Sequence, residues 1–246
     1  MKFFICVAFV FASIAPLAQS GDKHDFARIR RGETLQYKIK YGWFKIGEAE
    51  VKIDSRLHFF NNEPHYHIHF NLKAHGLLAL FSNLNLDLDS FVHSETFRPN
   101  RSVQTVRYGK RENSYFDDFF YADSIYVQYW KNQNEKEKFV FEETDVPFVD
   151  ALGSYLLVKT MDLNMSEPKN MQLYYGKEVY DFGITPDKSL ISSSDHDLKA
   201  YQIRLPDIQE FSVDKESYVI FRGRENILEE MKLATSDGNI YLILED

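Results

Sequence analysis

The stretch that decides the fold is ETLQYKIKYGWFKIGEAEVKID, residues 33–54. Apolar and polar side chains alternate on both sides of Gly42-Trp43, and alternation with a period of two is typical of a half-buried β-strand. The apolar face of its first half consists of Leu35, Tyr37, Ile39 and Tyr41. This pattern predicts an antiparallel hairpin. Gly47 interrupts the second half and indicates a bulge or a close backbone approach.

The same alternation continues along most of the chain. Tyr66, Ile68, Phe70 and Leu72 share one face of the next predicted strand, and Leu84, Leu86 and Leu88 share one face of the following strand. Further strand-like runs cover residues 102–108, 125–130, 138–142, 171–175, 179–184, 200–205, 218–221 and 240–244. Many short strands at hairpin spacing favour a curved antiparallel sheet, barrel or half-barrel of about ten to fourteen strands.

Residues 146–163 depart from this pattern. Apolar positions fall near helical spacing at Val149, Leu152, Tyr155, Leu156 and Leu163. Asp145 can cap the start of a helix and Pro147 is tolerated in its first turn. We therefore expect one amphipathic helix, near residues 149–162, that plugs or covers the sheet. No Pro/Gly/Ser-rich linker divides residues 21–246, so the expected fold is all-β with one helix and a single domain.

The first 20 residues have the parts of a signal peptide. Lys2 supplies the basic start, residues 3–18 are mostly apolar, and small residues precede a cleavage point after Ser20. An apolar run of about 16 residues falls short of the roughly 20 that a membrane-spanning helix needs. We expect an exported protein with no integral membrane span after cleavage. The single cysteine, Cys6, lies inside the apolar run, so lipid attachment is not expected.

The charge balance excludes one class of partner. The chain has 37 acidic and 29 basic residues, a formal net charge of −8. Binding of nucleic acid depends on clustered Lys and Arg that neutralise phosphates. We therefore expect no nucleic-acid partner.

The segment HYHIHF places three histidines at alternate positions of a predicted strand. His65, His67 and His69 would lie on one face, about 6.5–7 Å apart. Two of them could bind Zn²⁺ or Cu²⁺, with His58, His75 or His93 completing the set. The alternative is a polar, solvent-facing surface opposite a core face. Clustered histidines would also gain charge under mildly acidic conditions.

Carboxylates and nucleophiles do not form a recognisable catalytic motif. Ser154 lacks the second glycine of a nucleophile elbow. Asp117-Asp118 and the Asp195/Asp197 pair are assigned to polar turns, where Asp is common without catalysis. Asp87 and Asp89 alternate with Leu and are assigned to the wet side of a strand. No phosphate loop or dinucleotide fingerprint is present, and no cofactor is predicted.

Aromatic residues make up 15% of the chain. They suit cross-strand pairing in a β core, and they also suit an apolar groove for a lipid or glycan. In the second interpretation, Tyr126 and Trp130 would contact the ligand. Leu77, Leu78 and Phe81 would form an apolar lip, unless they form a buried turn between two strands.

Three blocks of sequence resemble the domain-of-unknown-function 3108 family. The first is GETLQYKIKYGWFKIGEAEVKI, with its family positions at Glu33, Leu35, Tyr37, Tyr41, Gly42, Gly47, Glu48 and Ala49. The second is LDLDSFVHSETFRPNRSVQTVRYG, with Asp89, Thr96 and Pro99. The third is FVDALGSYLLVKTMDL, with Asp150, Ser154 and Tyr155. The resemblance implies an exported protein of Gram-negative bacteria with an antiparallel β-barrel-like domain. It implies no catalytic residues.

Three functional hypotheses follow. The first is a non-catalytic envelope protein, in the periplasm or on the periplasmic face of the outer membrane, that binds a lipid or other amphipathic ligand, or another envelope protein, in the concave face of its sheet. The second is a structural or protein-interaction module whose barrel is filled by its own side chains. The third, and the least favoured, is a metal-dependent enzyme that uses His65, His67 and His69.

Overall fold

A computed structural model describes residues 25–75, 84–132, 135–161, 168–191, 195, 197–204, 217–235 and 238–245. The first half of the sheet consists of β1 (Thr34–Tyr41), β2 (Phe44–Ile53), β3 (His58–Phe60), β4 (Glu63–Ala74), β5 (Leu84–His93), β6 (Pro99–Tyr108), β7 (Arg111–Tyr121), β8 (Ser124–Lys131) and β9 (Glu135–Glu142). The second half consists of β10 (Phe148–Val149), β11 (Lys169–Tyr175), β12 (Glu178–Pro186), β13 (Leu198–Arg204), β14 (Tyr218–Arg222), β15 (Ile227–Thr235) and β16 (Gly238–Leu244). The α-helix α3 (Ala151–Thr160) and the short 3₁₀ helices η1 (Phe26–Arg28) and η2 (Lys188–Leu190) complete the described elements.

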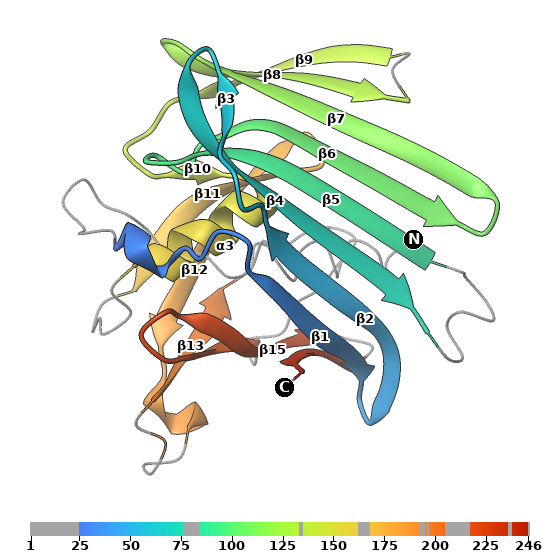
Figure 1. The fold of residues 1–246 in the computed structure, drawn as a ribbon, viewed down its shortest axis with the longest axis vertical. Coiled ribbons are helices and arrows are strands. Elements are labelled where there is room, and N and C mark those ends of the chain that lie inside the picture. Colours follow the sequence, from blue (N-terminus) through green and yellow to red (C-terminus); the bar gives the residue numbers. More distant parts are fainter. Residues whose placement is uncertain are drawn as a thin grey trace.

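All sixteen strands belong to one sheet that curves around α3 (Figure 1). The strand order is β10-β11-β12-β13-β14-β15-β16-β1-β2-β4-β5-β6-β7-β8-β9, and β3 pairs with β4 beside this path. Neighbours are antiparallel except β10 and β11, which are parallel. The sheet is not closed by hydrogen bonds within the described residues. Aromatic side chains bridge its two ends, because Phe148 of β10 and Tyr174 of β11 pack with Phe141 of β9. The predicted all-β, barrel-like fold with one helix is confirmed.

The opening hairpin forms as the sequence predicts. β1 pairs with β2 through Leu35 and Val51, and the turn lies at Gly42-Trp43. The register shifts between Ile39 and Lys40, which leaves Ile46 of β2, next to Gly47, as the extra residue of a bulge. A Cβ atom on Gly47 would lie 2.8 Å from the carbonyl oxygen of Lys73 in β4. Gly47 therefore lies beside a bulge and also allows the backbone of β4 to approach closely, which are the two alternatives that the sequence predicted.

Helix α3 lies inside the curve of the sheet, and all ten of its residues are buried. The predicted amphipathic helix is thus wrong in one respect, because no face of α3 meets solvent. The predicted cap is also wrong: Asp150, not Asp145, is the N-cap. The reason is that Phe148 and Val149 are extended and pair with β11, so the helix begins only after them.

Polar side chains provide hydrogen-bond partners for the backbone groups at the two ends of this buried helix. At the N-terminus, Asp150 Oδ1 accepts a hydrogen bond from the Gly153 N–H at 2.7 Å. At the C-terminus, the Asn226 side-chain amide donates to the carbonyl oxygens of Val158, Lys159 and Met161 at 3.2, 3.2 and 2.9 Å. Both ends of a helix carry unpaired backbone groups, which cost free energy if buried without partners. Asn226 therefore replaces the water that would serve an exposed helix end.

Replacing Asn226 with Asp tests this cap. The substitution keeps the shape of the side chain but removes both N–H donors and brings a carboxylate to the helix carbonyls. We expect the free energy of unfolding to fall by about 2–4 kcal/mol, because buried acceptors lose their partners. Urea unfolding followed by circular dichroism measures this change.

Asn132→Asp is the matched control. Asn132 has the same backbone conformation, φ 49°, and its Oδ1 atom accepts from the Ser114 N–H at 2.8 Å, a role that a carboxylate also fills. We expect a change within about 0.5 kcal/mol at this exposed site. Similar losses in both variants would contradict the capping role of Asn226.

Candidate functional site

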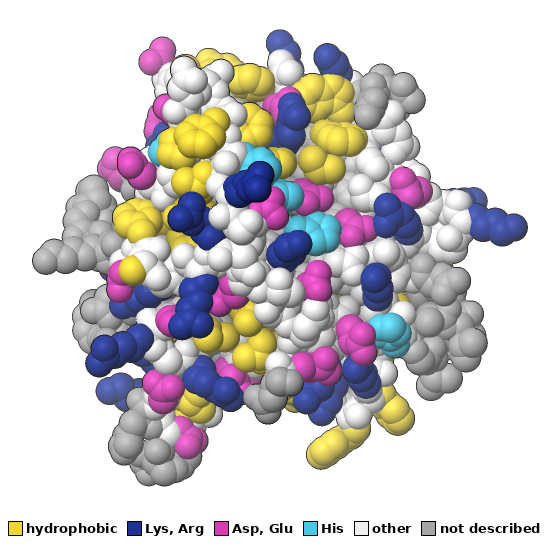
Figure 2. Space-filling model, in the orientation of Figure 1, with side chains coloured by type: hydrophobic (Ala, Val, Ile, Leu, Met, Phe, Trp, Pro, Cys, Tyr) yellow, Lys and Arg dark blue, Asp and Glu magenta, His cyan; other side chains and the backbone are white. Residues whose placement is uncertain are grey.

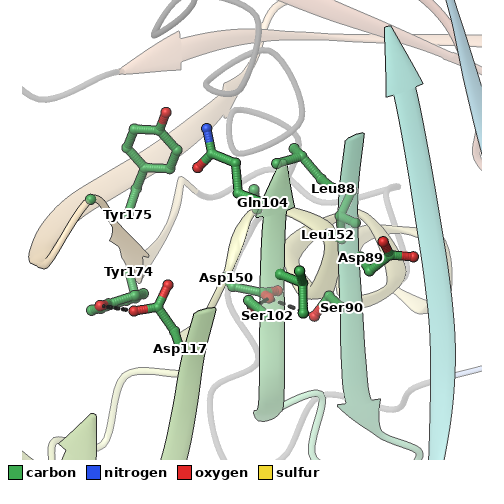
Figure 3. Close-up of a pocket in the computed structure, with 13 residues that line it drawn as sticks. Leu88, Asp89, Ser90, Ser102, Gln104, Asp117, Asp150, Leu152, Tyr174 and Tyr175 are labelled. Carbon is green, nitrogen blue, oxygen red and sulfur yellow. Dashed lines mark hydrogen bonds between the residues drawn. The ribbon is translucent and has the colours of Figure 1, made fainter. Parts of the chain in front are cut away.

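A polar cavity of about 50 Å³ lies between the N-terminus of α3 and the inner face of the sheet (Figure 3). Strands β5, β6 and β7 form one wall, and β11 forms another. Its polar lining includes Ser90, Ser102, Gln104, Asp117, Asp150 and Tyr174. Leu88 and Leu152 add an apolar side. Asp89 also borders the cavity, but its carboxyl group contacts His67 and His69. The carboxyl groups of Asp117 and Asp150 thus share one small cavity in the barrel interior.

Asp150 is the more constrained of the two carboxyl groups. Besides capping α3, its Oδ2 atom accepts hydrogen bonds from the hydroxyls of Ser90, at 2.5 Å, and Ser102. Burial raises the pKa of Asp150, and these hydrogen bonds oppose that effect without cancelling it. The hydrogen bonds from Ser90 and Ser102 also hold the N-terminus of α3 against β5 and β6.

Asp117 is less constrained. Its Oδ1 atom accepts a hydrogen bond from the Tyr174 hydroxyl at 2.7 Å. The pKa of Asp117 is raised to about 7, chiefly by burial and also by the negative charges of Asp150 and Asp118, although the hydrogen bond from Tyr174 lowers it. Near neutral pH this carboxyl group therefore exists in both protonation states, and it can donate or accept a hydrogen bond to a group in the cavity. A titratable side chain perturbed in this way inside a cavity is a candidate functional residue.

The sequence prediction for Asp117 and Asp118 is corrected here. They do not lie in a turn but in the middle of β7, which spans Arg111–Tyr121. Alternation along that strand points Asp117 into the barrel, whereas Asp118 faces outward and pairs with Arg101 at 2.5 Å. The run YFDDFFY contains aromatic residues on both strand faces, and this hid the alternation. The available signal was the two-residue spacing of Asp117 and Phe119, which places both on one strand face.

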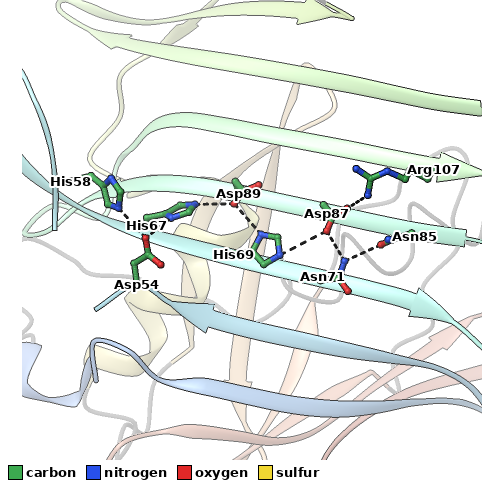
Figure 4. Close-up of polar contacts among 9 residues, drawn as sticks. All are labelled: Asp54, His58, His67, His69, Asn71, Asn85, Asp87, Asp89 and Arg107. Carbon is green, nitrogen blue, oxygen red and sulfur yellow. Dashed lines mark hydrogen bonds and ion pairs between the residues drawn. The ribbon is translucent and has the colours of Figure 1, made fainter. Parts of the chain in front are cut away.

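The outer face of the same sheet carries a row of alternating histidine and aspartate side chains (Figures 2 and 4). The members of this His–Asp row, in order along the surface, are His58, Asp54, His67, Asp89, His69 and Asp87. They come from β3, the end of β2, β4 and β5. The sequence assigned Asp87 and Asp89 to the wet side of a strand, and they lie on the outward face with the histidines.

Hydrogen bonds link the His–Asp row. Asp54 Oδ2 lies 3.0 Å from His58 Nε2 and 2.9 Å from His67 Nδ1. Asp89 Oδ1 lies 2.8 Å from His67 Nε2 and 3.0 Å from His69 Nδ1. Beyond His69, Asp87 accepts from Arg107 at 2.6 Å.

These contacts shift the pKa values of the row. Partial burial alone lowers the pKa of His67, but its hydrogen bonds to Asp89 and Asp54 outweigh burial and raise it. The hydrogen bond to Asp89 is the main reason that the pKa of His69 is raised. Burial favours the neutral form of Asp89, yet the two histidines hold its pKa well below the usual range.

His65 does not belong to this row. Its Nδ1 atom lies 2.9 Å from the carbonyl oxygen of Glu63. The residue is only 3% exposed, and the ring of Phe60 in β3 packs edge-on against its ring, with centroids 5.1 Å apart. Burial lowers the pKa of His65. The structure therefore separates His65 from His67 and His69, the other two members of the predicted metal-ligand set. The donor atoms that do lie within 4.8 Å of one another belong to Asp54, His58 and His67.

The residues predicted to contact a ligand do not line the interior cavity. Tyr126 and Trp130 alternate with the buried Ile125, Val127 and Tyr129, so they lie on the outer face of β8 rather than in the concavity. The cause is the alternation of side chains along β8, which places both residues on the face opposite Val127. The predicted lip residues Leu77, Leu78 and Phe81 lie outside the described residues. His75 pairs with Glu48 at 3.2 Å, and His93 packs against His65 at 5.3 Å.

The fold defines a class of protein in which one large antiparallel sheet curves around a buried helix. A family model described as "Protein of unknown function (DUF3108)" matches residues 36–201, more than half of the chain. The chain belongs to this family, as the three sequence blocks predict.

A solved structure shares the fold. It is the crystal structure of a beta-barrel-like protein of domain of unknown function DUF1849 from Brucella abortus. The TM-score is 0.55 at 9% sequence identity, and the match covers 87% of this chain and 95% of that chain. No curated protein matches the sequence. In the part of the chain that the structure describes, none of the helices has the length and apolar character needed to cross a bilayer.

The raised pKa of Asp117 predicts how stability changes with pH. A carboxyl group whose pKa is higher in the folded than in the unfolded protein stabilises the fold below pH 4, and this contribution is lost as pH rises through about 7. The Asp117→Asn variant cannot ionise. We therefore expect a smaller loss of unfolding free energy between pH 5 and pH 8 than in the wild type, as measured by urea unfolding.

Asp118→Asn is the control, since Asp118 faces outward and bonds to Arg101. The raised pKa values of His67 and His69 also favour the folded state at lower pH, and both variants retain this contribution. An unchanged pH dependence in Asp117→Asn would show that Asp117 titrates as an ordinary carboxylate.

Proposed function

We propose that this protein is an exported, non-catalytic envelope protein that binds a small polar group of an amphipathic ligand inside its barrel. The observation that carries the proposal is the cavity in which Asp117, with a pKa raised to about 7, faces a second buried carboxyl group, Asp150. The signal-peptide pattern of residues 1–20 supports export.

The lining limits the chemistry of the ligand. Both oxygens of Asp150 already accept hydrogen bonds within the protein, so Asp117 and Gln104 are the groups that would meet the ligand. The Asp117 carboxyl group and the Gln104 amide can each donate or accept a hydrogen bond, so the entering group is small and polar, as an amine or a hydroxyl is. A volume of about 50 Å³ is well below the roughly 300–1,000 Å³ that encloses a drug-sized ligand. An acyl chain does not fit within it. The apolar part of the ligand would instead lie outside the cavity, beyond Leu88 and Leu152.

Binding is favoured over catalysis because of how Asp150 is used. Paired carboxyl groups serve as acid and base in some hydrolases. Here one of the pair already caps α3 and accepts from two serine hydroxyls, so moving its proton would disturb the helix N-terminus. Asp117 alone remains adaptable.

A second function, a structural or interaction module, is favoured by a different observation. All ten residues of α3 are buried, and the core cluster that contains its apolar side chains includes residues of β1, β2, β4, β5 and β10 to β16. In that case the interior would be occupied by the protein itself, and the two carboxyl groups would only hold the helix in place.

Native mass spectrometry of protein isolated from its own envelope separates these functions. For the binding protein we expect a co-purifying adduct of defined mass in the wild type, reduced at least tenfold in Asp117→Asn, which keeps the side-chain shape. The outward-facing Asp118→Asn variant should retain the adduct. Repeated absence of any adduct from the wild type would favour the structural module.

A further inference from the structure

We propose that Asp54, His58 and His67 form a binding site for one Zn²⁺ ion on the outer face of the barrel, with Asp89 as the positioning residue for His67. This site is separate from the interior cavity, because its side chains point to the opposite face of the sheet (Figure 4). Its occupancy therefore does not depend on the function proposed above.

The donor atoms already lie near the positions that a metal ion requires. Asp54 Oδ2, His58 Nε2 and His67 Nδ1 all lie within 4.8 Å of one another. Bonds of about 2.0–2.2 Å in tetrahedral geometry place neighbouring ligand atoms roughly 3.3 Å apart. The distances from Asp54 Oδ2 to the two nitrogens, 3.0 and 2.9 Å, are a few tenths of an ångström shorter. Small side-chain rotations would admit an ion between the three atoms.

The contact between His67 and Asp89 is the second, independent observation. Histidines that bind zinc usually donate their other ring N–H to a carboxylate, which fixes the tautomer and the ring orientation. Asp89 Oδ1 lies 2.8 Å from His67 Nε2, the nitrogen that faces away from Asp54. When that nitrogen carries the proton of a neutral ring, Nδ1 presents its lone pair toward Asp54 and His58.

Packing holds the ligands in place. The His67 ring stacks on Phe91 with ring centroids 4.5 Å apart and planes 9° apart, and the His58 ring packs edge-on against Phe91 at 5.3 Å. The Asp54 N–H donates to the His67 carbonyl oxygen at 3.0 Å, which ties the end of β2 to β4. The site is therefore built on paired strands rather than on a loose loop.

Ligand chemistry selects the metal. Two imidazoles and one carboxylate suit Zn²⁺, whereas Mg²⁺ and Ca²⁺ prefer sites composed of oxygen ligands. The three side chains are between 20% and 40% exposed, so one side of the site faces solvent. Three protein ligands leave the fourth position of a tetrahedral ion open to water or to a group from another molecule.

Isothermal titration calorimetry with Zn²⁺ on tag-free, chelator-treated full chain tests the proposal. We expect one equivalent of Zn²⁺ per chain with micromolar or tighter affinity, and no binding of Mg²⁺. His58→Ala and His67→Ala should each weaken binding at least tenfold. Asp89→Asn, which leaves all three ligands in place, should weaken it by about 10- to 100-fold.

Two control variants keep the ligand assignment falsifiable. His75→Ala removes another exposed histidine that pairs with an acid, Glu48. His69→Ala removes the other partner of Asp89. Both variants should retain Zn²⁺ affinity within about threefold of the wild type. A cooperative urea unfolding transition, measured without metal, confirms that each variant is folded. Either of two results for the wild type would overturn the proposal: no binding of Zn²⁺, or binding of Cu²⁺ but not Zn²⁺. Equal Zn²⁺ affinity in all variants would also overturn it, as would a loss of affinity in His69→Ala equal to that in His67→Ala.

Discussion

The structure depends on the burial of a helix inside a sheet. Every residue of α3 is shielded from solvent, so the polar groups at its two ends need partners within the protein. Asp150 serves the N-terminus and Asn226, from the turn between β14 and β15, serves the C-terminus. The buried Lys159 also pairs with Glu33, which precedes β1. These contacts join the middle of the chain to segments near both of its ends, so the curvature of the sheet and the placement of the helix are established together.

The same requirement creates the interior cavity. A carboxyl group that caps a buried helix must itself be buried, and two serine hydroxyls from β5 and β6 stabilise it there. Asp117 of β7 faces the same space, where proximity to Asp150 adds to the effect of burial on its pKa. Because Asp150 caps α3, Asp117 lies in a confined polar space beside a second carboxyl group. Only the group without a capping role is available to a ligand.

Strand β5 links the two candidate sites. Leu88 and Ser90 point toward α3 and the cavity, whereas Asp87 and Asp89 point outward to the His–Asp row. Alternation with a period of two separates these roles within four consecutive residues, 87–90, of one strand. On the inner face low solvent exposure favours the neutral form of a carboxyl group. On the outer face neighbouring histidines favour the charged form. The pKa of an aspartate is therefore raised on the inner face, at Asp117, and lowered on the outer face, at Asp89.

Local patterns in the sequence determined much of this protein. Alternation predicted the hairpin of residues 33–54, most of the strands and the shared face of His67 and His69, and Gly47 predicted the bulge beside it. The three sequence blocks predicted the barrel-like fold and membership of the DUF3108 family. These features depend on residues close together in the chain, and side-chain direction within a strand follows from the backbone alone.

Tertiary structure alone decided which residues meet across strands. Strand register placed Asp54 and His58 beside His67, covered His65 with Phe60, turned Asp117 inward and turned Tyr126 and Trp130 outward. It also surrounded α3 on all sides, although the spacing of its apolar residues indicated one exposed face. The physical reason is that register and curvature arise from pairings between distant segments, whose combined free energy outweighs local preference.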